Sequence, residues 1–142
     1  MQRTWARNQN WENRITLFKN DIQHLDRSVR AHTFLADDLY RLLPSLVQTS
    51  GGTDYIQEVE DLYLKAIRID SSQSNSYNNL GAINYQYYKD YEQAIIFFEK
   101  ANQLDSENTN IHLNLAYCYG GLKDYNRSLN ALKRVLEIEP NN

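Results

Sequence analysis

The chain has 142 residues, of which 42% are apolar and 23% charged, so it suits one domain with a sizeable core. Five glycines and two prolines leave few helix breakers, which favours helices over many short strands. A formal net charge of −3 without a basic stripe argues against nucleic-acid binding, and the single cysteine, Cys118, excludes a disulfide within the chain. Because no apolar run approaches 18 residues, we expect no direct membrane insertion.

The sequence repeats with a period of about 34 residues, which is typical of solenoids built from small helical units. The Lys-Asp-Tyr sequence at 89–91 recurs at 123–125, and Leu80 corresponds to Leu115. Within a copy, apolar residues lie three or four apart, as with Ile95, Phe98 and Ala101. This spacing predicts amphipathic helices, two in each copy.

Residues 1–28 are predicted to hold a partial copy, mainly its second helix. The second-helix positions are taken by Trp11, Phe18, Asp21 and Asp26. Only residues 2–7 remain to represent the first helix of this copy, so we expect the chain to be a fragment of a longer protein.

Residues 29–73 are predicted to form a copy with an insertion. The first-helix positions hold His32, Leu35 and Ala36, but the matching Ala66 of the second helix comes eleven residues late. Pro44 disfavours an unbroken helix and Gly51-Gly52 supplies a flexible turn. We therefore expect the added residues near 44–53.

Residues 74–108 and 109–142 are predicted to form two further copies. The copy at 74–108 has 35 residues, which places one extra residue between its helices, whereas 109–142 has 34. Asp90 and Asp124 are suitable N-caps for second helices that begin one residue later. Pro140 is expected to end the last helix.

Counted from Thr109, the last copy holds Leu115 at position 7, Ala116 at 8, Tyr119 at 11, Ser128 at 20, Leu132 at 24, Val135 at 27 and Pro140 at 32. These are signature positions of the tetratricopeptide repeat, which the chain resembles. The resemblance implies an all-α fold, a right-handed superhelix of stacked antiparallel helix pairs that together form one domain.

Packing between the helices is expected to depend on small residues. A large side chain would hold two helix axes apart, so close approach is predicted at Gly81, Ala94, Ala116 and Ser128. The last helix has no following helix to cover its apolar residues, so we expect a homodimer through the terminal helices. The residues expected on this end face are Leu129, Leu132, Leu136 and Ile138.

Catalytic and metal-binding patterns are missing from the sequence, so we expect no enzyme activity, no cofactor and no metal in this chain. His32 and His112 take repeat position 4, where a bulky residue packs between helices. Cys118 is interpreted as a small buried hydrophobe. Most of the 11 tyrosines are interpreted as packing residues, although Tyr85 and Tyr117 face a different direction.

The resemblance implies a scaffold that binds a protein or an extended peptide on its concave surface, formed by the first helices. Carried over by repeat position, the expected contact residues are Arg30, Asp37 and Arg41 in 29–73, Asn78, Asn79, Tyr85 and Gln86 in 74–108, and Asn114 and Tyr117 in 109–142. Asn79 and Asn114 share position 6, and an amide can both donate to and accept from a peptide backbone. The alternative is that asparagine is simply common at a solvent-facing position. No cluster of Lys and Arg for binding a terminal carboxylate is seen there.

A narrower resemblance concerns the N-terminal stretch Arg7-Asn8, Trp11-Glu12-Asn13, Leu17-Phe18 and Asp21. It is similar to the segment that enters the repeats in membrane proteins with transmembrane helices followed by tetratricopeptide repeats, including protein O-mannosyltransferase relatives. This resemblance implies an alternative function, a substrate-binding, extracytoplasmic soluble tail of a membrane glycosyltransferase whose catalytic part is absent from this chain. A third alternative is a purely structural role, in which the inner surface binds nothing.

Overall fold

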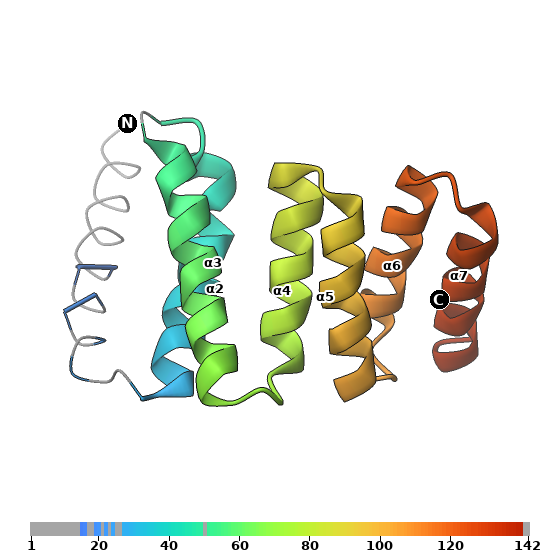
Figure 1. Cartoon of the computed structure of the whole chain (residues 1–142), viewed down its shortest axis with the longest axis horizontal. Helices are drawn as coiled ribbons and strands as arrows, with labels where there is room; N and C mark the ends of the chain where they lie inside the picture. The colour runs from blue at the N-terminus through green and yellow to red at the C-terminus, as the bar shows by residue number, and fades with distance from the viewer. Residues whose placement is uncertain are drawn as a thin grey trace. The chain divides into compact units, whose positions relative to one another are not determined.

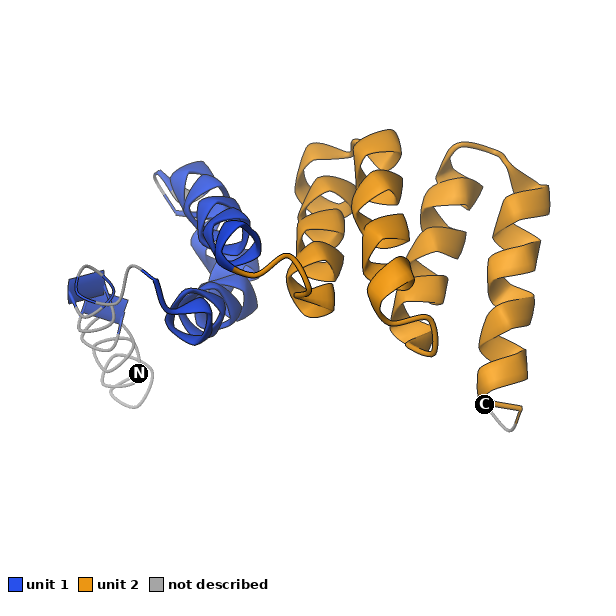
Figure 2. Cartoon of the chain, turned by 60° about the horizontal axis from the view of Figure 1, so that its bottom comes forward, with its two compact units in different colours: residues 1–69 blue, residues 70–142 orange. Residues whose placement is uncertain are grey.

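The computed structural model describes residues 27–49 and 51–140, and in the N-terminal segment residues 15, 16, 19, 20, 22 and 24. These described residues form six α-helices and one π-helical turn, with no β-strand among them (Figure 1). The predicted all-α class is therefore confirmed. The helices fall into two compact units, Met1–Ile69 and Asp70–Asn142 (Figure 2).

The first unit is built around a hairpin of α2 (Val29–Leu46) and α3 (Gly52–Ile69). Ser28 caps α2, since its hydroxyl oxygen accepts a 3.2 Å hydrogen bond from the Ala31 N–H. Side chains spaced three or four apart on each helix meet between them. The fully buried members of this interface are Leu35, Ala36, Leu39, Leu43, Val59, Tyr63 and Ala66.

The insertion expected near 44–53 lengthens both helices. Contrary to expectation, α2 continues through Pro44 to Leu46, and the turn follows at 47–51, where Gly51 has a φ of 80°. Both α2 and α3 have 18 residues, against 13 and 14 in the last pair. Burial of Leu39 and Leu43, which both lie in the turns just before Pro44, outweighs the proline penalty, because packing of an apolar face dominates helix stability.

The N-terminal segment also belongs to the first unit. Its described residues are helical from 15 to 24, and Lys19 Nζ lies 2.8 Å from Glu58 Oε1 on α3. The four residues that predicted a partial copy, Trp11, Phe18, Asp21 and Asp26, lie outside the described residues. The partial copy at 1–28 therefore stays a prediction.

The second unit contains α4 (Ser74–Ile83), α5 (Tyr91–Leu104), α6 (Thr109–Gly121) and α7 (Tyr125–Ile138). Each helix packs against the next, and α5 lies between α4 and α6 (Figure 1). Leu80 and Leu115 are both buried in the first helices of their copies, as their repeat positions predict. The other buried core residues include Ile83, Ala94, Phe98, Ala101, Ile111 and Cys118.

A π-helical turn, η1 (Asn84–Tyr88), ends the first helix of the 74–108 copy. Its wider turn accommodates the extra residue of this copy. The extra residue therefore lies inside the first helix, whereas the sequence predicted it between the two helices. Lys89 and Lys123 consequently occupy equivalent left-handed positions, with φ of 58° and 61°. Asn84 is buried, and its Nδ2 donates a 2.9 Å hydrogen bond to the Leu80 carbonyl, which stabilises the turn.

The predicted close approaches and caps are confirmed in the second unit. A Cβ added to Gly81 would lie 2.6 Å from Phe98 Cε1, and the Ser128 hydroxyl donates to the Ala116 carbonyl at 2.9 Å. Asp90 accepts from the Gln93 N–H at 2.9 Å, so it caps α5. Asp124 caps α7 through the Arg127 N–H, and α7 ends at Ile138, before Pro140.

Candidate functional site

Two asparagines join the first helices of consecutive copies. Asn114 Nδ2 on α6 donates a 3.0 Å hydrogen bond to Asn78 Oδ1 on α4. Both residues were predicted to contact a partner. The bond does not use the Nδ2 group of Asn78 or the Oδ1 atom of Asn114. Among the described residues neither of these two atoms has another partner. The pair thus retains one donor and one acceptor, the two kinds of group that a peptide group can bind.

Two tyrosines extend this surface toward the ends of the same helices. The rings of Tyr85 and Tyr117 stack with centroids 6.5 Å apart and an interplanar angle of 25°. Tyr91 lies against Tyr85 with centroids 5.8 Å apart, and Lys89 Nζ lies 6.0 Å from the Tyr85 centroid. Tyr117 is 60% exposed, so the pair presents an aromatic surface to solvent. We call the surface formed by Asn78, Tyr85, Asn114 and Tyr117 the α4–α6 face.

Asn79 and Gln86 do not enter these contacts in the way their repeat positions suggest. Asn114 pairs with Asn78 and not with Asn79, although Asn79 shares its repeat position. The bond therefore joins repeat position 5 of one copy to position 6 of the next. Gln86 is exposed within η1, where the π-helical turn changes the direction of side chains relative to a regular helix.

The three residues predicted from the first unit lie on α2. Asp37 Oδ1 accepts a 2.6 Å hydrogen bond from the Tyr63 hydroxyl, which holds this carboxylate against α3. Arg41 is exposed, with one guanidinium nitrogen 3.4 Å from Asp38 Oδ1, and Arg30 is exposed as well. Partner contact by Arg30, Asp37 and Arg41 stays a prediction.

Charge is segregated within the second unit. Residues 71–88 and 108–122, which include α4, η1 and α6, contain no Asp, Glu, Lys or Arg. Their one titratable cation, His112, is buried. Apart from Asp70, every charged side chain of this unit lies in 89–107 or 123–139. The α4–α6 face is therefore uncharged, with Lys89 at its edge.

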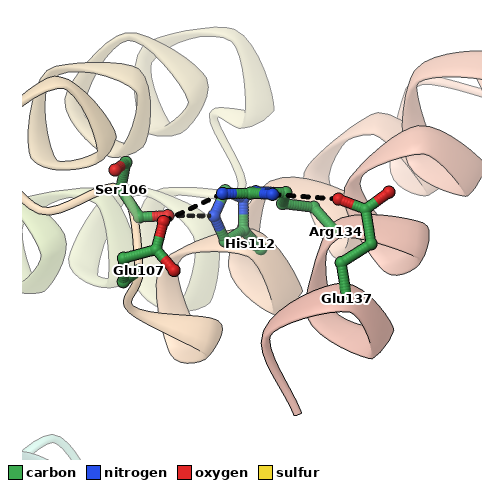
Figure 3. Close-up of polar contacts among 5 residues, drawn as sticks. All are labelled: Ser106, Glu107, His112, Arg134 and Glu137. Atoms are coloured by element: carbon green, nitrogen blue, oxygen red, sulfur yellow. Dashed lines mark hydrogen bonds and ion pairs between the residues drawn. The ribbon is translucent and has the colours of Figure 1, made fainter. Parts of the chain in front are cut away.

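The histidines at repeat position 4 contribute to packing. His112 Nε2 lies 2.8 Å from the Ser106 carbonyl oxygen in the turn before α6 (Figure 3). Beside it, Arg134 on α7 binds both Glu107 and Glu137 at 2.9 Å, which ties the last helix to the same turn (Figure 3). His32 Nδ1 lies 2.8 Å from the Ser28 carbonyl oxygen. No set of three metal-ligating side chains occurs in the part of the chain that the structure describes.

The single thiol is also a packing group. Cys118 is buried in α6, and this burial raises its pKa to about 11, so the thiol is protonated at neutral pH. A protonated, inaccessible thiol is a poor nucleophile.

Comparison with known proteins identifies the repeat. Residues 87–142, which hold the end of η1 and helices α5 to α7, match the family model described as Tetratricopeptide repeat. Residues 87–142 belong to the tetratricopeptide-repeat family. No curated protein matches it in sequence.

Solved structures of tetratricopeptide-repeat proteins share its fold. TTC0263 from Thermus thermophilus is 16% identical with a TM-score of 0.77, and the match covers 99% of this chain and 71% of that one. YrrB, described as a TPR protein with an unusual peptide-binding site, is 23% identical with a TM-score of 0.69, covering 88% and 58%. The first TPR of Spaghetti (RPAP3), bound to the HSP90 peptide SRMEEVD, is 20% identical with a TM-score of 0.61, covering 75% and 81%.

The narrower resemblance to membrane-protein tails stays a prediction. The residues that carry it, such as Trp11 and Phe18, lie outside the residues that the structure describes. Among the helices that the structure describes, none is both long and apolar enough to span a bilayer.

The last tetratricopeptide repeat leaves one face of α7 open. Leu129, Leu132 and Leu136 are 52%, 41% and 55% exposed, as expected for an uncovered terminal helix, whereas Ile138 is only half-exposed. Tyr125, which the sequence analysis took as a packing residue, is 69% exposed and lies on the same stripe. The intervals of four, three and four residues from Tyr125 to Leu136 were the signal that would have revealed it.

Proposed function

We propose that this chain is a protein-interaction scaffold and that its α4–α6 face binds an extended segment of a partner protein. The observation that carries the proposal is the pairing of Asn78 with Asn114, which leaves one amide donor on Asn78 and one amide acceptor on Asn114. An extended peptide offers the complementary carbonyl and N–H groups in every residue, so this recognition does not depend on the partner's side chains.

The stacked tyrosines support the same proposal. Tyr117 keeps most of its ring in solvent although aromatic side chains are usually buried in a helical repeat. Aromatic residues that are exposed next to hydrogen-bonding groups are typical anchors of protein interfaces. The peptide-binding descriptions of YrrB and of the first TPR of Spaghetti are consistent with this use of the fold.

Site-directed photo-crosslinking tests the proposal with the full chain. A photoreactive phenylalanine derivative replaces Tyr117 on α6 in one sample and Ile96 on α5 in the matched control, since these residues are 60% and 59% exposed on different helices. We expect crosslinks to a discrete protein in a lysate of the source organism only from position 117. Equal crosslinking from both positions, or none from 117, would contradict the proposal and favour a structural role for the chain.

The asparagine pair gives a quantitative check with the purified crosslinked partner. Asn78→Ala with Asn114→Ala removes both amides, so we expect about tenfold to hundredfold weaker binding, in line with ~1 kcal/mol for each lost hydrogen bond. Calorimetric titration measures the change. Asn130→Ala on α7 is the matched control and should leave the affinity unchanged.

We propose, second, that the chain self-associates through α7. The stripe of Tyr125, Leu129, Leu132 and Leu136 follows heptad spacing, and its four side chains are each at least 41% exposed. A helix with this pattern is self-complementary, because two copies related by a two-fold axis pack the same residues against each other. A second copy of this chain is therefore the proposed occupant.

Sedimentation velocity tests this second proposal. Leu132→Asp places a charge in the centre of the stripe and should convert a dimer to a monomer at micromolar concentrations. Asn130→Asp adds the same charge on the polar side of α7 and should leave the dimer intact. A wild-type chain that sediments as a monomer at all concentrations would rule out self-association.

A further inference from the structure

The α4–α6 face lacks counter-charges for a charged ligand. Residues 71–88 and 108–122 contain no Asp, Glu, Lys or Arg, and their one titratable cation, His112, is buried, so the face can offer a bound carboxylate or ammonium group no ion pair at its centre. A charged side chain of the ligand would lose its hydration on such a surface and gain no ion pair that compensates for this loss. An amide, a hydroxyl or a ring loses much less when it is desolvated.

The tyrosine pair adds a shape requirement. Tyr85 and Tyr117, whose ring centroids lie 6.5 Å apart with planes 25° from parallel, form an aromatic surface on the same helices as the asparagine pair. Proline and aromatic rings pack well on such a surface, and proline also restricts the peptide to an extended conformation before it binds. Lys89 lies over Tyr85 at the edge, where it disfavours a cationic side chain of the ligand on that ring.

On the basis of the function proposed above, we infer that the segment recognised by the α4–α6 face is uncharged and places a proline or aromatic ring on Tyr85 and Tyr117. The asparagine amides then bind the backbone of the segment, and the ring selects the sequence. The face discriminates between peptides mainly through the free-energy cost of desolvating their charged residues. It therefore selects a peptide by rejecting charged side chains as much as by binding a ring.

A displayed library of random peptides, each about twelve residues long, tests this inference on the full chain. Clones are selected on the wild-type chain and depleted on Tyr117→Ala, so that only ligands of the α4–α6 face remain. Tyr117 is 60% exposed, and the circular dichroism spectrum of the variant verifies that it folds. Depletion on Ile96→Ala, whose side chain is 59% exposed on α5, is the matched control.

We expect the remaining clones to be depleted of Asp, Glu, Lys and Arg and enriched in proline and aromatic residues. Synthetic versions should bind with affinities that change less than about twofold between 50 and 500 mM salt, because no ion pair is screened. Enrichment in charged residues, with affinity that falls about tenfold or more over this range, would overturn the inference while leaving the binding face in place. Absence of any clone that depends on Tyr117 would overturn the proposed function itself.

A change of charge on the face provides a second readout. Asn114→Asp is nearly isosteric and puts a carboxylate at the centre of the α4–α6 face. Selection on this variant should shift the clones toward Lys and Arg, and affinity for the original uncharged peptides should fall about tenfold. Asn130→Asp is the control for net charge and should select the same peptides as the wild type. Identical selections on Asn114→Asp and wild type would overturn the inference.

Discussion

Gly81 on α4 faces the ring of Phe98 on α5, and an added Cβ would lie 2.6 Å from Phe98 Cε1. No Cβ tolerates such a contact with a buried ring, so the two helices would have to separate. We expect Gly81→Ala to lower the free energy of unfolding by about 1 to 3 kcal/mol, the usual range for overpacking. Urea denaturation measures this change.

Gly120→Ala is the matched control for this substitution. A Cβ at Gly120 would meet only Ser128 Oγ, at an ordinary distance of 3.8 Å. Alanine is the better helix former, so the control should gain up to about 1 kcal/mol of stability. Destabilisation of both variants by the same amount would show that close approach at Gly81 is not the cause.

Stability at high pH should depend on Tyr119. Burial, together with its 2.8 Å hydrogen bond to Glu99, raises the pKa of Tyr119 from 10.0 to about 12. Because the unfolded chain releases this proton first, the free energy of unfolding is unaffected below pH 10 and falls as the pH rises from about 10 to 12. Thermal denaturation across this range should show a smaller fall in Tyr119→Phe. A Tyr119→Phe curve parallel to that of the wild type would contradict the assignment.

Cys118 should be protected from alkylation in the folded chain. Burial in α6 raises its pKa to about 11, so both its ionisation and its access to solvent require opening of the structure. At pH 8 we expect iodoacetamide to modify the native chain at least about a hundredfold more slowly than the chain in denaturant. Mass spectrometry follows the reaction, and rapid modification of the native chain would show that α6 opens locally.

Lys123 should be a site where glycine stabilises the protein. Its φ of 61° is left-handed, a conformation that glycine adopts without the steric cost that other residues incur. We expect Lys123→Gly to raise the free energy of unfolding by about 0.5 to 1 kcal/mol. Lys133→Gly, inside α7, should instead lower it by about 1 kcal/mol, so chemical denaturation of the two variants gives opposite signs.

The candidate site was predicted in part. Asn78, Tyr85, Asn114 and Tyr117 were all expected on one surface from their repeat positions, and the structure brings them together. The pairing of Asn114 with Asn78 in place of Asn79 was not predictable, because it depends on how the two first helices are placed against each other. Sequence spacing sets the face of a helix on which a residue lies, but not which residue of a neighbouring helix it meets.

The sequence by itself determined the helix pairs of the second unit, their caps at Asp90 and Asp124, and the small residues at their crossings. These are local or periodic properties, which a 34-residue repeat displays more than once. Only the tertiary structure decided that α2 continues through Pro44 and that η1 takes up the extra residue of its copy. In both places, the free-energy cost of breaking or widening the helix is opposed by the burial of its apolar side chains against another helix. That balance depends on buried residues such as Tyr63 and Phe98, which are remote in the sequence.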